Sequence, residues 1–243
     1  MNRQFLKAIK LSAKAASSFA FATFLLTPAA ADELIPKHVD RILIESFSPD
    51  NSKGKPIPKG WRASRDNLSM FSFGNEGGNY FTTVSSKKDC TSMGMPYPYS
   101  SEQYPILNWR WRVHKLPNGA TELEREKNDS GAGLYVIFKG PFKFNNIIKY
   151  VWSSSLPVGA HTPSPYNKNT KIVVLQSGID KANTWVTESV NIYEDYKRLF
   201  GCKPPKVEGF GILTDSDNTK SSAIADYDDI SMSKGTGAVA SSN

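Results

Sequence analysis

The chain has few of the residues that most often build metal centres or nucleophilic sites. Its 243 residues include 2 cysteines and 3 histidines, and the histidines (His38, His114 and His161) lack the close spacing of metal ligands. It also contains no Gly-x-Ser-x-Gly elbow, no phosphate-binding loop and no dinucleotide-binding fingerprint. These absences argue against a zinc enzyme, an α/β-hydrolase and a nucleotide-binding fold.

Acidic residues are absent from the first 31 positions. This segment has basic residues at positions 3, 7, 10 and 14, an apolar run over roughly 15–26 and then Ala29-Ala30-Ala31, which is the pattern of a secretory signal peptide. The apolar run is too short to cross a bilayer, and no later run approaches the roughly 18 apolar residues that a spanning helix needs. We therefore predict cleavage after Ala31 and an exported protein, periplasmic or extracellular, with no transmembrane segment and no lipid anchor.

A strong excess of one charge is lacking once this segment is removed. The whole chain has 30 Lys+Arg and 23 Asp+Glu, a net charge of +7, but four of the basic residues lie in 1–31, which leaves 26 against 23, or +3. This balance gives little reason to expect nucleic acid as a partner. The remaining 212 residues suffice for one large β-domain with its own core. Whether Cys90 and Cys202 form a disulfide stays open.

Residues 104–113, YPILNWRWRV, alternate between apolar and polar side chains with a period of two. This is the period of a β-strand with one buried face, which aromatic residues suit. Two guanidiniums on the polar face, about 7 Å apart at ~3.3 Å per residue, suit carboxylate, sulfate or phosphate groups. The same arginines could instead be solvated or paired with acids of the protein itself. The apolar face consists of Leu107, Trp109, Trp111 and Val113, and the polar face of Asn108, Arg110 and Arg112.

Other segments have the same strand character and are separated by turn residues. The clearest are 41–47, 68–73, 80–84, 133–138, 147–153, 171–178, 207–214 and 223–232. One short helix is expected at about 191–200, because Asn191 can cap its start, Glu194 follows three residues on, and Gly201 can end it. The sequence therefore predicts an all-β fold, an antiparallel β-sandwich or jelly roll, in one domain over 32–233 with a disordered tail over 234–243.

A second segment with ligand-binding character covers residues 150–169. Tyr150 and Trp152 share a face of one predicted strand, and the loop that follows contains three prolines, His161 and Tyr166. Long, proline-containing loops are often functional, and aromatic rings beside polar groups are what a sugar site requires. The alternative is that the tryptophans all belong to the core. The predicted ligand-binding residues, expected to meet in one groove, are Arg110, Arg112, Tyr150, Trp152, His161 and Tyr166.

Four stretches stand out by their order and spacing. They are YPILNWRWRV (104–113), KYVWSSSLPVGAHTPSPYNK (149–168), WVTESVNIYEDYKRLFG (185–201) and GFGILTDSDNTKSSAIADYDDISM (209–232). Together they resemble an uncharacterised family of secreted bacterial proteins, the DUF3047 family, which implies no activity. The segments 44–47 and 227–232 also resemble the end strands of galactose-binding-like jelly rolls, the fold of many carbohydrate-binding modules. That second resemblance implies a structural calcium ion near the paired ends.

Two carboxylates are candidates for such a calcium site. Glu45 in the first strand and Asp228 in the last each share a strand face with apolar residues. A carboxylate there is costly unless it is paired, hydrogen-bonded or bound to a cation. If the end strands are neighbours, both acids can bind Ca²⁺; the alternative is that each accepts hydrogen bonds from the protein. A further acidic cluster, 215–219, lacks the glycine of a calcium-binding helix-loop-helix and is better explained as a turn.

These observations predict an exported protein that binds carbohydrate, or another anionic or polyhydroxylated ligand of the cell envelope, without catalysis. Two alternatives stay open. One is a polysaccharide lyase or hydrolase that uses the same face, in which Arg110 or Arg112 would act with His161 or Tyr150. The other is a periplasmic protein-interaction module, which a dry, exposed apolar patch would favour.

The compartment is directly testable. The mature protein, purified after export, should begin at Asp32, because the predicted cleavage site follows Ala31. N-terminal sequencing and intact-mass measurement check this. A full-length chain retained in the cytoplasm would contradict it.

Overall fold

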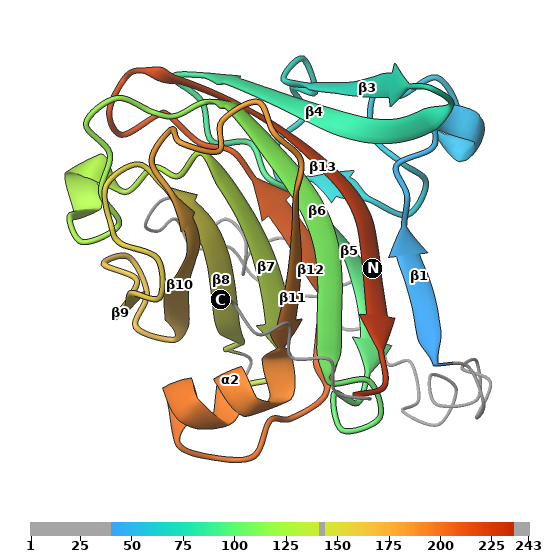
Figure 1. The fold of residues 1–243 in the computed structure, drawn as a ribbon, viewed down its shortest axis with the longest axis vertical. Helices are drawn as coiled ribbons and strands as arrows, with labels where there is room; N and C mark the ends of the chain where they lie inside the picture. The colour runs from blue at the N-terminus through green and yellow to red at the C-terminus, as the bar shows by residue number, and fades with distance from the viewer. Residues whose placement is uncertain (1–39, 141–143, 236–243) are drawn as a thin grey trace.

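Two β-sheets pack face to face in the computed structural model, which describes residues 40–140 and 144–235 (Figure 1). Sheet A contains, in spatial order, β11 (Val186–Asn191), β6 (Ile106–Lys115), β13 (Ser222–Ser233), β4 (Asn79–Lys87) and β3 (Phe71–Glu76), and β1 (Arg41–Glu45) also pairs with β13. Sheet B contains β2 (Arg62–Ala63), β5 (Met93–Tyr99), β12 (Val207–Leu213), β7 (Ala132–Phe138), β8 (Asn146–Ser153), β10 (Thr170–Ser177) and β9 (His161–Pro163). The predicted β-sandwich is confirmed. The predicted signal peptide and most of the predicted tail lie outside the described residues.

The core lies between the two sheets and is rich in aromatic residues. As predicted from the period of two, the apolar face of β6 is buried. The Trp109 ring packs 5.7 Å from that of Tyr150 on β8, and the Trp111 ring lies 6.2 Å from that of Trp152. Rings from both sheets therefore interdigitate, which fixes the outward direction of the alternate residues on β6. No disulfide joins the two cysteines, which are free thiols, Cys90 buried and Cys202 exposed.

The predicted helix is present as α2 (Ile192–Phe200). The Asn191 side chain accepts a hydrogen bond from the Glu194 amide, and Gly201 ends the helix with φ +72°. Ile192 and Tyr196 are buried, so the helix closes one end of the sandwich (Figure 1). Two 3₁₀ turns, η2 (Pro49–Asn51) and η3 (Arg125–Lys127), complete the helical segments that the described residues contain. None of these described helices is long and apolar enough to cross a membrane.

Strand β5 is not among the strands predicted from the sequence. Its Pro96 and Pro98 argue against a strand, since proline cannot donate to a sheet. The structure accommodates them because β2 pairs only with Met93 and Gly94. The second half of β5 therefore has a partner, β12, on one side alone. Prolines are tolerated where a strand has a free edge.

The pairing of β8 with β10 is a second departure, because these two strands are parallel in a sandwich that was expected to be antiparallel throughout. A parallel neighbour requires the chain to cross back along the sheet. The long loop 154–169 makes this connection and contributes the short strand β9 to the edge of sheet B. Its length therefore has a topological cause, in addition to any functional one.

A buried polar cluster lies at one end of sheet B, where β7, β8 and β12 meet. Lys149 donates to the Ser130 hydroxyl, and Ser130 in turn donates to Glu122. The Asp215 carboxylate accepts the Ser130 amide at 2.7 Å, so the acidic segment 215–219 is part of a side-chain-bonded turn, as the sequence analysis favoured. Burial raises the pKa of Asp215 to about 7, because removal from water disfavours its charged form. Lys149 provides the opposing charge.

This raised pKa makes stability depend on pH. The folded state retains the proton of Asp215 up to about pH 7, whereas the unfolded chain loses it near pH 4. The free energy of unfolding should therefore fall as pH rises from 4 to 7, by about 1–4 kcal/mol from this group. Urea unfolding at pH 5 and pH 8 should show a smaller decrease in Asp215→Asn than in the wild type. Equal decreases in the two proteins would contradict this explanation.

Candidate functional site

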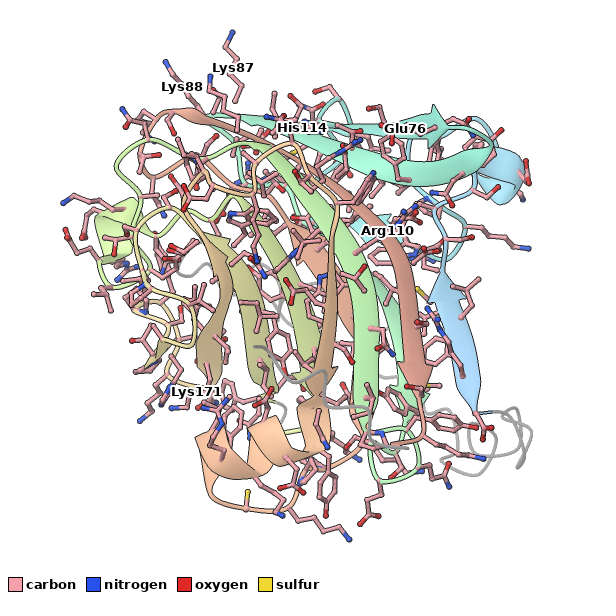
Figure 2. The ribbon with its side chains drawn as sticks, viewed as in Figure 1. Glu76, Lys87, Lys88, Arg110, His114 and Lys171 are labelled. Atoms are coloured by element: carbon pink, nitrogen blue, oxygen red, sulfur yellow. The ribbon has the colours of Figure 1, made fainter. Side chains whose placement is uncertain are left out.

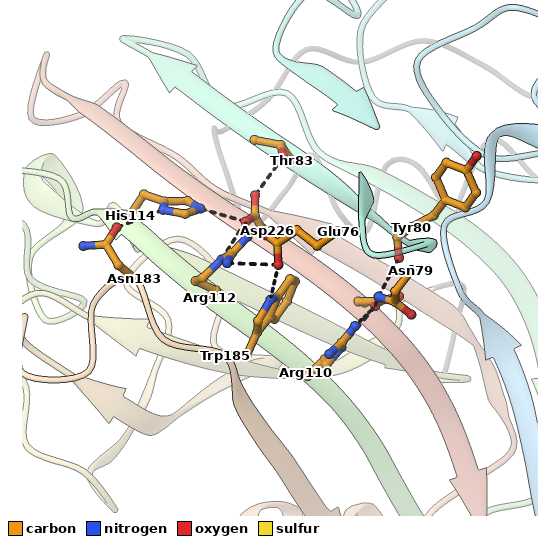
Figure 3. Close-up of polar contacts among 11 residues, drawn as sticks. Glu76, Asn79, Tyr80, Thr83, Arg110, Arg112, His114, Asn183, Trp185 and Asp226 are labelled. Atoms are coloured by element: carbon orange, nitrogen blue, oxygen red, sulfur yellow. Dashed lines mark hydrogen bonds and ion pairs between the residues drawn. The ribbon is translucent and has the colours of Figure 1, made fainter. Parts of the chain in front are cut away.

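The outer face of sheet A carries a row of paired charges. On β6 the outward residues are Asn108, Arg110, Arg112 and His114, which alternate with the buried core positions. The register places Asp226 of β13 opposite Arg112, and Asp228 opposite Arg110. Arg110, Arg112 and Asp226 therefore point away from the core onto one surface (Figure 3), and Asp228 shares this face through its register opposite Arg110. In the described residues the second sheet packs on the other face of sheet A.

Arg112 binds two carboxylates from different strands. Its Nε and Nη2 donate to Asp226 Oδ2 at 3.0 and 2.7 Å, and Nη2 also donates to Glu76 Oε1 at 2.7 Å. Thr83 on β4 donates to the other oxygen of Asp226. The Arg112 side chain is only 13% exposed and that of Asp226 2%. Arg112 therefore supplies the charge that makes a buried Asp226 tolerable.

Arg110 forms the second pair of the row. Its Nε and Nη2 donate to Asp228 Oδ2 at 3.1 and 2.6 Å, and the Asn79 amide donates to the same oxygen. Arg110 Nε also lies 3.3 Å from Asp229 Oδ2. The Asp228 side chain is fully buried, and this burial raises the pKa of its carboxyl group. Arg110 is 25% exposed, so it reaches the surface above the acid that it neutralises.

Trp185 lies over these pairs. The guanidinium carbons of Arg110 and Arg112 are each 4.5 Å from the centre of its ring, and its Nε1 donates to Glu76. Phe81 contacts the ring edge-to-face at 5.4 Å. Because Trp185 directly precedes β11 and Phe81 belongs to β4, the indole extends across β6 and β13. It remains partly exposed, so an aromatic surface faces the solvent above the charges.

A glycine makes room for this aromatic pair. Gly74 on β3 stands opposite Phe81 in the register. A Cβ atom at Gly74 would lie 2.2 Å from the Phe81 ring, closer than any real contact. The hairpin of β3 and β4 therefore needs glycine here to let the Phe81 ring lie flat against the strand. The same hairpin positions Glu76 and Asn79 beside the arginines.

Two further groups fix the position of the network. His114 Nε2 lies 2.7 Å from Asp226 Oδ2, and its Nδ1 lies 2.9 Å from Asn183 Oδ1 (Figure 3). Hydrogen bonds from Arg112 and Trp185 hold the pKa of Glu76 below its ordinary value. Glu76 is therefore ionised at neutral pH, and more than half of its side chain is exposed to solvent.

Two residues beside this network have strained backbones. Asp229 and Asn183 have φ values of +54° and +63°, in the left-handed region that non-glycine residues rarely adopt. At Asp229 the register of β13 against β6 shifts, which is a β-bulge beside Arg110. Strained residues and bulges are frequent at functional sites, where they direct side chains. The bulge at Asp229 therefore supports a functional role for the outer face of sheet A.

The predicted groove does not form as expected. Tyr150 and Trp152 are completely buried and face the core from sheet B, whereas Arg110 and Arg112 face outward from sheet A. Their assignment as residues at a ligand-binding surface is therefore wrong. The pattern of the strand could not reveal this, because a period of two shows that faces differ but not which face is covered. The alternative, that these rings fill the core, is the one observed.

His161 and Tyr166 also lie apart from the arginines. His161 is exposed on β9, at the edge of sheet B. Tyr166 donates to the Arg125 carbonyl at 2.7 Å, lies 2.9 Å from Asn218 Oδ1, and has the Arg125 guanidinium 5.0 Å from its ring. It therefore links three loops at one end of the sandwich. Of the six predicted ligand-binding residues, the structure brings together Arg110 and Arg112.

The predicted calcium ligands are near one another but have other partners. The end strands are neighbours, as the calcium prediction required, with Glu45 opposite Ile230. Glu45 accepts the Trp61 indole N–H and the Phe47 amide, both at 2.7 Å, while Asp228 is bound by Arg110 and Asn79. These partners all donate hydrogen bonds to the carboxylate oxygens that a cation would need, so the two acids as arranged here do not fit a calcium ion between them. The described residues contain no group of three or more potential ligands that could hold a metal ion.

Four residues of this network were not predicted from the sequence: Trp185, Glu76, Asp226 and His114. One signal was available, because Asp226 and Asp228 alternate on β13 as Arg110 and Arg112 do on β6, and matching charge pairs favour neighbouring strands. The position of Trp185 depends on the loop before β11, and that of Glu76 on the hairpin of β3 and β4. Neither leaves such a pattern in the sequence.

A separate shallow cleft of about 420 Å³ lies between β10, β11 and α2. Its walls are mainly aliphatic, including Val158, Val173 and Val190, and Arg198 lies at its rim. It contains no aromatic ring and none of the predicted ligand-binding residues. It is therefore the weaker candidate for a sugar site.

Loss of Arg112 should destabilise the fold. Arg112→Ala should lower the free energy of unfolding by about 3 kcal/mol or more, because it leaves the Asp226 carboxylate buried without its guanidinium. Arg198→Ala is the matched control, since its ion pair with Asp195 on α2 is more exposed, at 47% and 21% against 13% and 2% for Arg112 and Asp226, and its loss should cost less than about 1 kcal/mol. Chemical denaturation measures both. Similar small losses in the two variants would show that Arg112 has no structural role.

Comparison with known proteins places the chain in a family. No curated protein sequence matches it. Similar solved structures include a family 11 carbohydrate-binding module of a cellulosomal cellulase from Clostridium thermocellum, at 8% identity over 83% of this chain and 98% of that chain with a TM-score of 0.43. Another is a carbohydrate-binding module from Caldicellulosiruptor saccharolyticus in complex with mannohexaose, at 10% identity over 80% and 97% with a TM-score of 0.38. The family model described as "Protein of unknown function (DUF3047)" matches residues 59–231, and the chain belongs to this family, as its four stretches indicated.

Proposed function

We propose that the protein binds carbohydrate on the outer face of sheet A, without catalysis. The observation that supports this best is the environment of Trp185. Its partly exposed ring packs against planar charged groups, with Arg110 and Arg112 each 4.5 Å from the ring centre and Glu76 bonded to its indole N–H. An aromatic surface with fixed polar groups beside it suits a sugar, which has apolar C–H groups and hydroxyls on one ring.

The polar groups at the rim can both donate and accept hydrogen bonds. Glu76 and Asp229 are 52% and 43% exposed and can accept from hydroxyl groups, while the partly exposed Arg110 can donate. Planar carboxylate and guanidinium groups can each bond two neighbouring hydroxyls. Thr187 and Asn183 add exposed polar side chains on the β11 side. The face therefore offers both kinds of partner that sugar hydroxyls need.

The network is also ordered before any ligand arrives. Ion pairs fix Arg110 and Arg112, and Asn183 and Glu76 are held by His114 and Arg112. Side chains that are already fixed lose little conformational entropy on binding, so more of the interaction free energy appears as affinity. This supports a binding face more than a loosely solvated set of surface charges.

The buried state of the carboxylates supports binding rather than catalysis. Asp226 and Asp228 are buried beneath their guanidinium partners, out of reach of a glycosidic oxygen. The exposed Glu76 has a lowered pKa, whereas the general acid of a hydrolase needs a raised one. A hydrolase needs two carboxyl groups that both reach the scissile bond. A protein-interaction role has less support, because the large exposed apolar side chains, such as Leu43, Val158 and Ile179, belong to separate elements.

We also propose that this binding takes place outside the cytoplasm. The support is the signal-peptide pattern of residues 1–31. Polysaccharides of the cell envelope or of the surroundings would then be the available ligands.

Replacement of Trp185 tests the proposed function. The mature protein should bind a subset of oligosaccharides on a glycan array, and Trp185→Ala should weaken that binding about tenfold or more, since an aromatic contact contributes roughly 0.5–1.5 kcal/mol beyond its buried area. Trp185→Phe should retain part of the affinity. Calorimetry with the best array ligand measures the difference.

The matched control is Ile179→Ala, which removes a largely exposed side chain from the same loop. It should leave the affinity unchanged. Equal affinities for the wild type and a folded Trp185→Ala variant would place the sugar elsewhere.

A further inference from the structure

Carboxylates outnumber cations in the network around Trp185. Glu76, Asp226, Asp228 and Asp229 face two guanidiniums, those of Arg110 and Arg112. Each guanidinium already donates to carboxylate oxygens through its Nε and Nη2. Both arginines are therefore already paired with acids of the protein itself, and an acidic ligand would have to compete with those acids.

Two carboxylates of this network are more exposed to solvent than the guanidiniums. The Glu76 and Asp229 side chains are 52% and 43% exposed, against 13% and 25% for Arg112 and Arg110. Hydrogen bonds keep the pKa of Glu76 below its ordinary value, so this carboxylate is negative at neutral pH. A ligand that approaches Trp185 from solvent meets carboxylate oxygens before it meets guanidinium nitrogens.

One further guanidinium comes near this face without reversing the balance. Arg41 on β1 donates from its Nε to Ser231 Oγ at 3.1 Å, two residues from Asp229 on β13, so four carboxylates face three guanidiniums. Lys87 is farther away, because its partner on β13 is Ser222, four residues from Asp226, or about 13 Å at ~3.3 Å per residue, beyond the screening length of physiological salt, ~8 Å. Lys87 and Lys88 also project away from the upper end of the molecule (Figure 2). His114 is bound to Asp226.

We infer that this face selects sugars that carry a free amino group, such as glucosamine units, over uncharged sugars and over uronic acids. The inference rests on the proposed function, because it concerns the ligand of the same face. An ammonium group beside Glu76 or beside Asp229 gains charge-assisted hydrogen bonds. A uronate carboxylate in the same position would be repelled.

Three oligosaccharides of equal length test the inference. Tetramers of glucosamine, N-acetylglucosamine and galacturonic acid are titrated into the full mature protein by calorimetry at about pH 6, where the amine is protonated, in low salt and at about 0.5 M NaCl. The glucosamine tetramer should bind at least tenfold more tightly than the N-acetylated one, and the galacturonate tetramer most weakly. High salt should reduce the preference, because screening weakens exposed charge pairs.

Two variants locate the preference. Glu76→Gln keeps an acceptor for the Trp185 indole, and Asp229→Asn places in the left-handed position a residue that tolerates it. Each substitution should reduce the affinity for the glucosamine tetramer several-fold. The difference in affinity between the glucosamine and N-acetylglucosamine tetramers should fall as well. Glu194→Gln on α2 removes a similarly exposed, lysine-paired carboxylate away from this face and should change nothing.

The outcomes separate this inference from the proposed function. Equal affinity for the glucosamine and N-acetylglucosamine tetramers, or tighter binding of galacturonate, overturns the amine preference but leaves carbohydrate binding intact. A preference that survives in both Glu76→Gln and Asp229→Asn also overturns the inference. If none of the tetramers binds the folded wild-type protein, the amine preference is overturned and carbohydrate binding itself loses its support.

Discussion

Two aspartates buried on the outer side of a sheet impose the main physical constraint on this protein. A carboxylate without water costs several kcal/mol unless a cation and hydrogen-bond donors replace its hydration. Asp226 and Asp228 obtain these from Arg112 and Arg110, because the register of β6 against β13 places each pair directly opposite. A shift of that register by one residue would turn the arginines toward the core and leave the acids unpaired.

The rest of the outer face follows from this pairing. The arginines support the Trp185 ring from β6, and Glu76 reaches both Arg112 and the indole from the hairpin of β3 and β4. Stability and binding therefore depend on the same contacts. A substitution that frees a guanidinium for a ligand would also expose the fold to the cost of a buried acid, which explains why the exposed groups at the rim, rather than Arg112, are the ones available for recognition.

Local patterns in the sequence predicted the local structure correctly. The alternation of residues 104–113 defines both faces of β6, and Asn191 and Gly201 delimit α2. What the sequence could not provide was the pairing of distant segments. Arg112 and Asp226 are 114 positions apart, and no local signal shows which strands will be neighbours or which side of a strand the second sheet will cover. Tyr150 and Trp152 were misassigned for that reason, and Trp185 was missed because its position depends on the path of a loop.

The central claim is that the outer face of sheet A binds carbohydrate, and mapping of amide and indole NMR shifts during an oligosaccharide titration tests it most directly. The account predicts saturable shifts confined to β6, β13, the start of β4 and the segment 183–187, with the Trp185 indole N–H among the largest. Shifts that instead cluster at the cleft between β10, β11 and α2, or along sheet B, while Trp185 stays unchanged, would contradict it.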